Sequence, residues 1–380
     1  AQACQPTSNP SHHVASELLA GPDGPYTTIL HMDRILGQPA ALDALRNQLA
    51  TQRVHHAQIF HGPAGVGKFT TAVAFARELL CHDSVTDLHG NASACDHCTS
   101  CKLFRQINEA EGSTDPTAAL SSAHPDLHII TKELALFSDD AQERGRKLTT
   151  IPVGVIREHL LGPASLAPQL NHGKVFIVDE AELLNATGQN ALLKTLEEPT
   201  PGTYLILVTS SEHRLLPTIR SRCQRVAFGP LEDSAVSRWL SDHHADLDEQ
   251  TAKWVVGFAQ GSLGRASLAV RFELVEWGTA VLSPVQRLAK SGRPEPNLGA
   301  SIGSSVDGFA AAWVAAHKNA SKEAANRRAA ALMGSMISNF ARRRMATIAE
   351  QCDPDTPSDS EQQLTPWLGV IAAVTEFEAQ

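Results

Sequence analysis

The sequence predicts an α/β fold in which a parallel sheet is followed by helices only. Strand-like and helix-like segments alternate over the first 230 residues, an order that is typical of parallel, doubly wound sheets. Continuous apolar runs at 175–178 and 205–208 indicate strands that are buried on both faces. Beyond about residue 231 strand-like segments cease and helical patterns, many of them rich in alanine, take their place.

The elements of the sheet region are predicted from apolar periodicity and from helix stop signals. Pro199 ends one helix, because proline lacks the N–H that a helix interior needs. The stretch 132–150 is polar and irregular, which indicates a surface insertion. In chain order we expect a helix at 39–53, a strand at 56–62, a helix at 69–81, a strand at 124–130, a helix from Pro152 through 161, a strand at 175–178, a helix at 185–198 and a strand at 203–211.

The predicted domain boundaries follow changes in composition. Residues 1–31 are rich in turn formers and read as a disordered tail, and Met32 is a candidate translation start. An α/β core is expected at 32–230, short helices at 231–280, a linker at 281–300 that contains the Pro- and Gly-rich stretch "SGRPEPNLG", and a helical region at 301–380.

Composition excludes several classes of protein. The formal net charge of −9 over 380 residues argues against a broad surface for coating nucleic acid. No apolar run approaches the roughly 20 residues of a membrane span, so we expect no membrane association. Four of the seven cysteines lie between residues 81 and 101, which favours a metal site in a reducing cytoplasm over a disulfide framework.

The segment "HGPAGVGKFT" predicts a phosphate-binding loop. A predicted strand precedes it and a predicted helix follows it, which is the context that such a loop requires. Backbone N–H groups and the helix dipole would surround an anion, and Lys68 would reach the outer phosphates. The candidate binding residues are Gly62, Pro63, Ala64, Gly65, Val66, Gly67, Lys68, Phe69 and Thr70.

Phe69 occupies the position where a Ser or Thr hydroxyl normally binds Mg²⁺. Thr70 lies one residue later, and one helical residue rotates a side chain by about 100°, away from the metal. Asp179 and Glu180 end a later apolar strand, where we expect Asp179 to hold Mg²⁺ through water and Glu180 to polarise an attacking water. The sequence therefore predicts retained ATP and Mg²⁺ binding at a degenerate site with weak or absent hydrolysis.

Four cysteines predict one structural zinc site. Cys95, Cys98 and Cys101 follow one another at two-residue gaps, and Cys81 lies upstream. Four thiolates are the number and type of ligand that tetrahedral Zn²⁺ prefers, and they leave no open position for catalysis. Isolated buried cysteines are the alternative, but this spacing disfavours it.

These segments together resemble the AAA+ clamp-loader subunits of bacterial DNA polymerase III. The resemblance covers about residues 33–275 and rests on "ILGQ", "GPAGVGK", the four-cysteine insertion, "VDEAELL", "NALLKTLEEP", "LVTSS" and "LLPTIRSRC" in that order. "HPDLHII", the "IREHL" helix, "GSLGRA" and the residue after Lys68 favour the delta-prime type over the gamma/tau type. The resemblance implies an AAA+ P-loop sheet, a helical lid and a C-terminal all-helical collar.

The resemblance also implies roles for particular residues. Thr209 or Ser210 corresponds to sensor 1, Arg265 to sensor 2, and Arg222 to an arginine finger that serves a neighbouring subunit. On spacing alone, Arg222 would be an ordinary surface arginine. The implied partners are the gamma/tau and delta subunits, the sliding clamp and, through the complex, primed DNA.

Three functions remain open. The first is a largely non-hydrolysing delta-prime-like subunit, a component of DNA polymerase III that donates Arg222 to its neighbour. The second is an active gamma/tau-type motor ATPase, which Lys68, Asp179 and Glu180 support. The third is an unrelated P-loop enzyme such as a small-molecule kinase, for which the sequence offers no evident acceptor pocket or substrate base.

Overall fold

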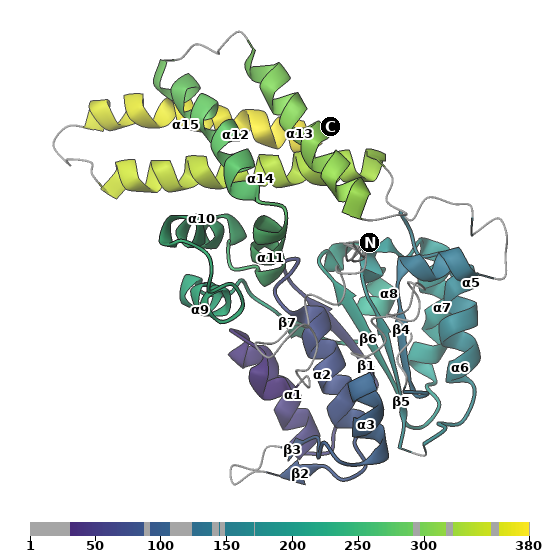
Figure 1. Cartoon of the computed structure of the whole chain (residues 1–380). Coiled ribbons are helices and arrows are strands. Elements are labelled where there is room, and N and C mark those ends of the chain that lie inside the picture. Colours follow the sequence, from purple (N-terminus) through teal and green to yellow (C-terminus); the bar gives the residue numbers. More distant parts are fainter. Residues whose placement is uncertain are drawn as a thin grey trace, which may run out of the picture. The chain divides into compact units, whose positions relative to one another are not determined.

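The chain forms two compact units. The computed structural model describes residues 31–86, 92–106, 124–138, 144, 149–170, 172–291, 297–316, 322–350 and 357–379 (Figure 1). Within these residues, one unit lies in His12–Leu247 and Ala259–Arg265, and the other in Asp248–Phe258 and Ala266–Gln380. The predicted tail at 1–31 lies, except for His31, outside the described residues.

The first unit is built on a five-stranded parallel sheet, which confirms the predicted fold class. The strand order is β4-β5-β6-β1-β7, so the first strand in the sequence lies between the last two. His61 at the end of β1 is in register with Thr209 at the end of β6. The strands are β1 (Ala57–His61), β4 (Leu127–Ile130), β5 (Lys174–Val178), β6 (Thr203–Thr209) and β7 (Gln224–Ala227).

Helices cover both faces of this sheet, which explains why its strands are almost entirely apolar. Alternate residues of a strand point to opposite faces. Phe60 packs its ring against Phe75 of α2 (Lys68–Leu80), whereas Ile59 belongs to a core that includes Leu192 of α7 (Ala186–Glu197). Other elements of this unit are η3 (Met32–Arg34), α1 (Pro39–Ala50), α3 (Thr99–Gln106), α5 (Val153–Ile156), a π-helical turn (Arg157–Leu161), α6 (Gly162–Ala164), η7 (Ala181–Leu183), η8 (Glu212–Arg214), α8 (Pro217–Arg220) and α9 (Asp233–His243).

Carboxyl ends of all five strands meet at one edge of the sheet, because the strands are parallel. The loop after β1 and the segments after β5 and β6 therefore lie at the same edge, where open α/β sheets bind ligands. The two short strands β2 (Val85–Thr86) and β3 (Ala92–Ser93) form a separate antiparallel pair. They belong to the cysteine-containing segment that follows α2.

The second unit is helical, in agreement with the predicted C-terminal helices. Neighbouring helices pack through aromatic residues: Trp313 stacks on Phe272, and the Arg328 guanidinium lies 4.2 Å from the Trp313 ring centre. None of the described helices is long and apolar enough to cross a membrane. The helices are α12 (Leu274–Ser291), α13 (Leu298–Ala316), α14 (Lys322–Glu350) and α15 (Pro357–Ala379), while α10 (Glu249–Ala259) and α11 (Leu263–Arg271) contribute to both units.

Two local predictions differ from the structure. The segment predicted as a linker at 281–300 is helical up to Ser291, since α12 continues through Pro284, and α13 begins at Leu298. The segment predicted as irregular at 132–150 begins with a 3₁₀ helix, η5 (Lys132–Phe137). Residues 292–296, 139–143 and 145–148 of these segments lie outside the described residues.

Candidate functional site

The loop between β1 and α2 requires glycine at three positions. Gly62, Gly65 and Gly67 have φ values of 143°, 73° and 96°, a region that residues with a Cβ rarely adopt. A Cβ on Gly62 would lie 2.1 Å from the Phe228 carbonyl oxygen. A Cβ on Gly65 would lie 2.4 Å from the Ser262 hydroxyl oxygen. The glycines thus allow both the turn and the close approach of neighbouring segments.

Each backbone carbonyl of the loop, from Gly62 to Gly67, accepts a hydrogen bond from a group outside the loop. Three of the donors are distant in the sequence, so the loop is held by segments that pack around it. The donors are the Lys68 ammonium for Gly62 and Pro63 (2.8 and 2.5 Å), the Ser262 hydroxyl for Ala64 (2.9 Å), the Gly264 N–H for Gly65 (3.0 Å), the Gln38 amide for Val66 (3.1 Å), and the Thr71 N–H and hydroxyl for Gly67 (2.9 and 2.8 Å).

The carbonyl groups of the loop point outward, and its N–H groups remain available to bind a ligand. No backbone N–H from Gly62 to Gly67 donates to another described residue. Because the C=O and N–H of a trans peptide point in opposite directions, these N–H groups face the inside of the loop. Successive N–H groups next to a helix N-terminus form an anion-binding concavity. The geometry can therefore hold a phosphate group.

Lys68 is buried against this loop at the start of α2. Its ammonium donates to the Gly62 and Pro63 carbonyls, so it lies on the loop itself. Burial lowers the pKa of Lys68, an effect that the charges of Glu182 and Asp179 oppose. A phosphate in the loop would supply the anion that this buried ammonium lacks.

Asp179 and Glu180 follow β5 at the same edge of the sheet. Burial and the neighbouring charge of Glu180 raise the pKa of Asp179 to about 7. Glu180 is exposed, has a φ of 49°, and forms an ion pair with Lys132. A bound cation would stabilise the ionised form of the Asp179 carboxylate, and carboxylate oxygens are ligands that Mg²⁺ accepts.

Replacing Asp179 with asparagine should stabilise the chain when neither nucleotide nor Mg²⁺ is present. The pKa of Asp179 is about 7 when folded and about 3.9 when unfolded, so its ionisation disfavours the folded state. The penalty is fully present above pH 7 and fades as the pH falls towards 4. We expect the free energy of unfolding of Asp179→Asn to rise by up to about 4 kcal/mol at pH 8 and by up to about 1.5 kcal/mol at pH 5.

Chemical denaturation at both pH values measures this effect. Asp246→Asn, which changes an exposed aspartate, serves as the matched control and should leave the stability unchanged. Equal or lower stability of Asp179→Asn at pH 8 would show that Asp179 is not a strained carboxylate.

The predicted sensor-1 residues, Thr209 and Ser210, lie beside Glu182. Thr209 is buried at the end of β6, and the Ser210 N–H donates to the Glu182 carboxylate at 3.2 Å. Burial acts to raise the pKa of Glu182, but hydrogen bonds from Ser210 and Thr209 outweigh it and lower the pKa. Glu182 is thus held in its ionised form, and it links the segment after β5 to the end of β6.

Two threonines follow Phe69, and their hydroxyl groups differ in burial and in hydrogen bonding. Phe69 and Thr70 are half-buried in the first turn of α2. Thr71 is fully buried, and its hydroxyl donates to the Gly67 carbonyl. Thr71 is therefore committed to the loop backbone and cannot replace the hydroxyl that Phe69 lacks.

The two predicted arginines occupy different surroundings. Arg222 lies just after α8 with a side chain that is 36% exposed, where its guanidinium is 2.5 Å from Glu197 and donates to the Thr218 carbonyl at 2.9 Å. Arg265 is half-buried in the first turn of α11, and donates to the Gln260 side chain at 2.9 Å. Burial lowers the pKa of Arg265. The turn that carries Arg265 is the one that contacts the phosphate loop through Ser262 and Gly264.

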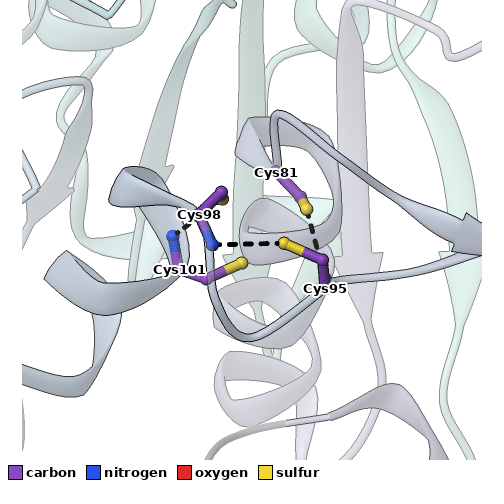
Figure 2. A group of neighbouring side chains, drawn as sticks. All are labelled: Cys81, Cys95, Cys98 and Cys101. Carbon is purple, nitrogen blue, oxygen red and sulfur yellow. Dashed lines mark hydrogen bonds between the residues drawn. The ribbon is translucent and has the colours of Figure 1, made fainter.

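The four predicted zinc ligands converge at the end of α2 (Figure 2). The sulfur atoms of Cys81, Cys95, Cys98 and Cys101 all lie within 4.8 Å of one another. Figure 2 also shows backbone N–H groups that donate to sulfur: those of Cys95, Cys98 and Cys101 reach the preceding cysteine of the set at 3.3 to 3.4 Å. No disulfide links these cysteines, which are all free thiols.

This cluster fits a zinc ion. A Zn–S bond of about 2.3 Å places the sulfur atoms of a tetrahedral site about 3.8 Å apart, within the observed limit. Although burial acts to raise the pKa of Cys95, N–H donors from His97 and Cys98 lower it to about 6. At least one thiolate is therefore present at neutral pH before a metal binds, as zinc binding requires.

Sequence reasoning missed several residues that contact the phosphate loop or lie near it at the same edge of the sheet. Gln38 is buried, donates to the carbonyls of Val66 and Gly229, and accepts from the Gly229 N–H. Ser262 and Glu182 are the others. All three lie in motifs that carried the resemblance, "ILGQ", "GSLGRA" and "VDEAELL", so the motifs marked them without revealing their contacts.

Comparison with known proteins gives a consistent result. Residues 37–232 match the family model described as "DNA polymerase III, delta subunit". DNA polymerase III subunit delta' of Bacillus subtilis is 31% identical over 215 residues, which cover 55% of this chain and 54% of that protein. The delta' subunit of Pseudomonas aeruginosa is 33% identical, with 58% and 57% covered. DNA polymerase III subunit tau of Escherichia coli is 28% identical, with 66% and 34% covered. The chain matches these delta' relatives over about half of their length.

Proposed function

Because the chain belongs to the DNA polymerase III, delta subunit family, we propose that it is a delta-prime-type subunit of a bacterial clamp loader. In this role it assembles with gamma/tau-type and delta subunits in the cytoplasm and helps to load the sliding clamp on primed DNA. It acts chiefly as a scaffold and as a donor of Arg222, and hydrolyses little or no ATP itself.

One observation carries this proposal: a loop that can hold phosphate, with every carbonyl from Gly62 to Gly67 hydrogen-bonded, is combined with Phe69 at the position of the metal-binding hydroxyl. The loop can hold a nucleotide through its N–H groups, Lys68 and the start of α2. Asp179 would supply a carboxylate to Mg²⁺, and the ion would offset the charge of the phosphates. Phe69 removes one ligand of that ion, and Thr71 cannot supply another.

Arg222 supports the role in the neighbouring subunit. Its guanidinium is partly exposed and, among the residues that the structure describes, contacts Glu197 and the Thr218 carbonyl at the surface. Exposed ion pairs contribute about 0.2–1 kcal/mol, so Arg222 can leave Glu197 at little cost. An arginine from the next subunit can then stabilise the charge that develops during phosphoryl transfer.

Zinc completes the proposal as a structural cofactor. Cys81, Cys95, Cys98 and Cys101 would hold it and leave no open coordination position. The ion would join the end of α2 to the segment that follows, where β2 and β3 are only two residues long each.

A gamma/tau-type motor is the second candidate, favoured by the phosphate loop with Lys68 and by Asp179 and Glu180. Both candidates predict assembly with other clamp-loader subunits, but they differ in the activity of the isolated chain. A motor turns over at rates typical of enzymes, roughly 1 s⁻¹ or faster, whereas the proposed subunit does not.

Restoring the hydroxyl should raise ATP hydrolysis by the isolated chain. Phe69→Thr supplies the missing Mg²⁺ ligand next to Asp179 and Glu180, so we expect a measurable gain in turnover above a very low starting rate. Phe69→Val, which shortens the side chain without adding a hydroxyl, is the matched control and should give no gain. Steady-state phosphate release measures both. A parent chain that already turns over at 1 s⁻¹ would instead support the motor.

A further inference from the structure

Arg77 is the largest fully buried side chain of the described residues. It lies on α2, four residues before Cys81, and is 1% exposed. A buried guanidinium is unfavourable unless anions and hydrogen-bond acceptors surround it. The groups that stabilise Arg77 therefore indicate what this position is for.

Asp96 is the first of these groups. Its carboxylate forms an ion pair with the Arg77 guanidinium, and it lies between Cys95 and Cys98, in the turn that presents two of the four thiols. Asp96 has a φ of 67°, so the backbone of this turn adopts an uncommon conformation. The same carboxylate lies 3.0 Å from the His31 ring and is 32% exposed.

The second group is the thiol cluster itself. Burial lowers the pKa of the Arg77 guanidinium, and the fully buried Cys101, its hydrogen-bond partner, opposes this effect. Cys81 opposes it as well. The planar guanidinium carries five N–H donors, so one edge can bind Asp96 while another faces sulfur.

The net charge of a four-thiolate zinc site would make the neighbouring Arg77 important. Four thiolates around one Zn²⁺ carry a net charge of −2, and this charge would lie in a largely buried setting. Water cannot offset it well there, so a fixed cation has a larger effect than at the surface. Arg77 is a cation in that setting, on the helix that ends at the first ligand.

We propose that Arg77 is an outer-sphere positioning residue for zinc, which stabilises the anionic four-thiolate site and is held in place by Asp96. This inference rests on the proposed zinc site. It assigns Asp96 a secondary role, since Asp96 orients the guanidinium but adds a negative charge of its own. Arg77 and Asp96 should therefore affect zinc affinity unequally.

Competition for Zn²⁺ between the full chain and a chromophoric chelator tests this inference. Loss of outer-sphere partners typically lowers metal affinity by about 10–100-fold, so we expect Arg77→Met to lower the Zn²⁺ affinity by an amount in this range. Arg77→Lys keeps the charge without the planar fork and should lie between Arg77→Met and the parent. Arg53→Met, at an exposed arginine, is the matched control and should change affinity less than about twofold.

Asp96→Asn distinguishes charge from general structural damage, and it remains informative if Arg77→Met does not fold. Both changes break the same ion pair, so a purely structural role predicts an equal loss of affinity. The charge role predicts that Asp96→Asn, which keeps the cation, loses clearly less affinity than Arg77→Met and stays below the 10–100-fold loss expected for that variant. Equal losses, or parental affinity in folded Arg77→Met, would overturn the inference. Absence of zinc binding by the parent chain would overturn the zinc site itself.

Discussion

Replacing Cys98 with serine is expected to release the zinc ion and to unfold the segment from Cys81 to Cys101. Structural zinc sites bind with apparent free energies of about 10–16 kcal/mol at pH 7, and this binding energy is folding energy for the segment around them. Four sulfur atoms within 4.8 Å of one another share that energy, so a serine hydroxyl in place of one thiolate weakens the whole site. The two-residue strands β2 and β3 offer little to replace it.

Metal analysis and hydrogen exchange measure this effect. The parent chain should contain one zinc per molecule, and Cys98→Ser should contain almost none and lose amide protection across 81–101. Cys223→Ser is the matched control: burial raises the pKa of this isolated thiol to about 12, so it is a neutral core residue and not a ligand. One zinc per chain in Cys98→Ser, with unchanged protection, contradicts the proposed ligand set.

The sequence predicted the fold class because its signals are local. Apolar runs at 175–178 and 205–208 mark strands covered on both faces, and they correspond to parts of β5 and β6. Glycine spacing after β1 predicted the loop between β1 and α2, and cysteine spacing predicted the group of four thiols that could hold a metal. The resemblance to delta-prime-type subunits was confirmed by the family match over residues 37–232.

Long-range partners could not be predicted in the same way. Hydrophobic periodicity says that Gln38 and Ser262 begin or flank helices, but not that both bind carbonyls of a loop that is distant in the sequence. The burial of Arg77 could not be predicted either, because a basic residue in an amphipathic helix normally indicates an exposed face. Its burial follows from the position of Asp96 and the thiols, which depends on how the segment after α2 folds back.

The predicted linker differs for a physical reason as well. Proline and glycine are concentrated at 291–299, and in the structure α12 ends at Ser291 and α13 begins at Leu298. The part from 281 to 291 contains one proline, Pro284, but its apolar residues Val281, Val285 and Ala289 recur at helical spacing and are buried. Packing of that face offsets the hydrogen bond that proline removes.

Replacing Arg222 with alanine is expected to leave the fold of the chain almost unchanged and to impair the assembled clamp loader. The side chain makes only a surface ion pair with Glu197 and one hydrogen bond, so its loss should cost no more than about 1 kcal/mol of stability. At a neighbouring ATP site that depends fully on the arginine, the rate of hydrolysis should fall by about 10³-fold or more.

Bulk ATP hydrolysis by the complex should fall much less than this, because only one of several sites receives Arg222. Clamp loading should fall further, since we expect the sites to act together. Arg222→Lys keeps the charge but loses the planar fork, and should behave nearly as Arg222→Ala does. Arg214→Ala removes a nearby exposed arginine from η8 and is the matched control.

The central claim is that this chain works through Arg222 in a neighbouring subunit, and the rate of clamp loading on primed DNA tests it most directly. Complexes are reconstituted with the parent chain, Arg222→Ala or Arg214→Ala, and their assembly is verified before the rate is measured. We predict near-parental loading with Arg214→Ala and a large loss with Arg222→Ala. Parental loading by a fully assembled Arg222→Ala complex would contradict the claim and leave Arg222 as an ordinary surface arginine.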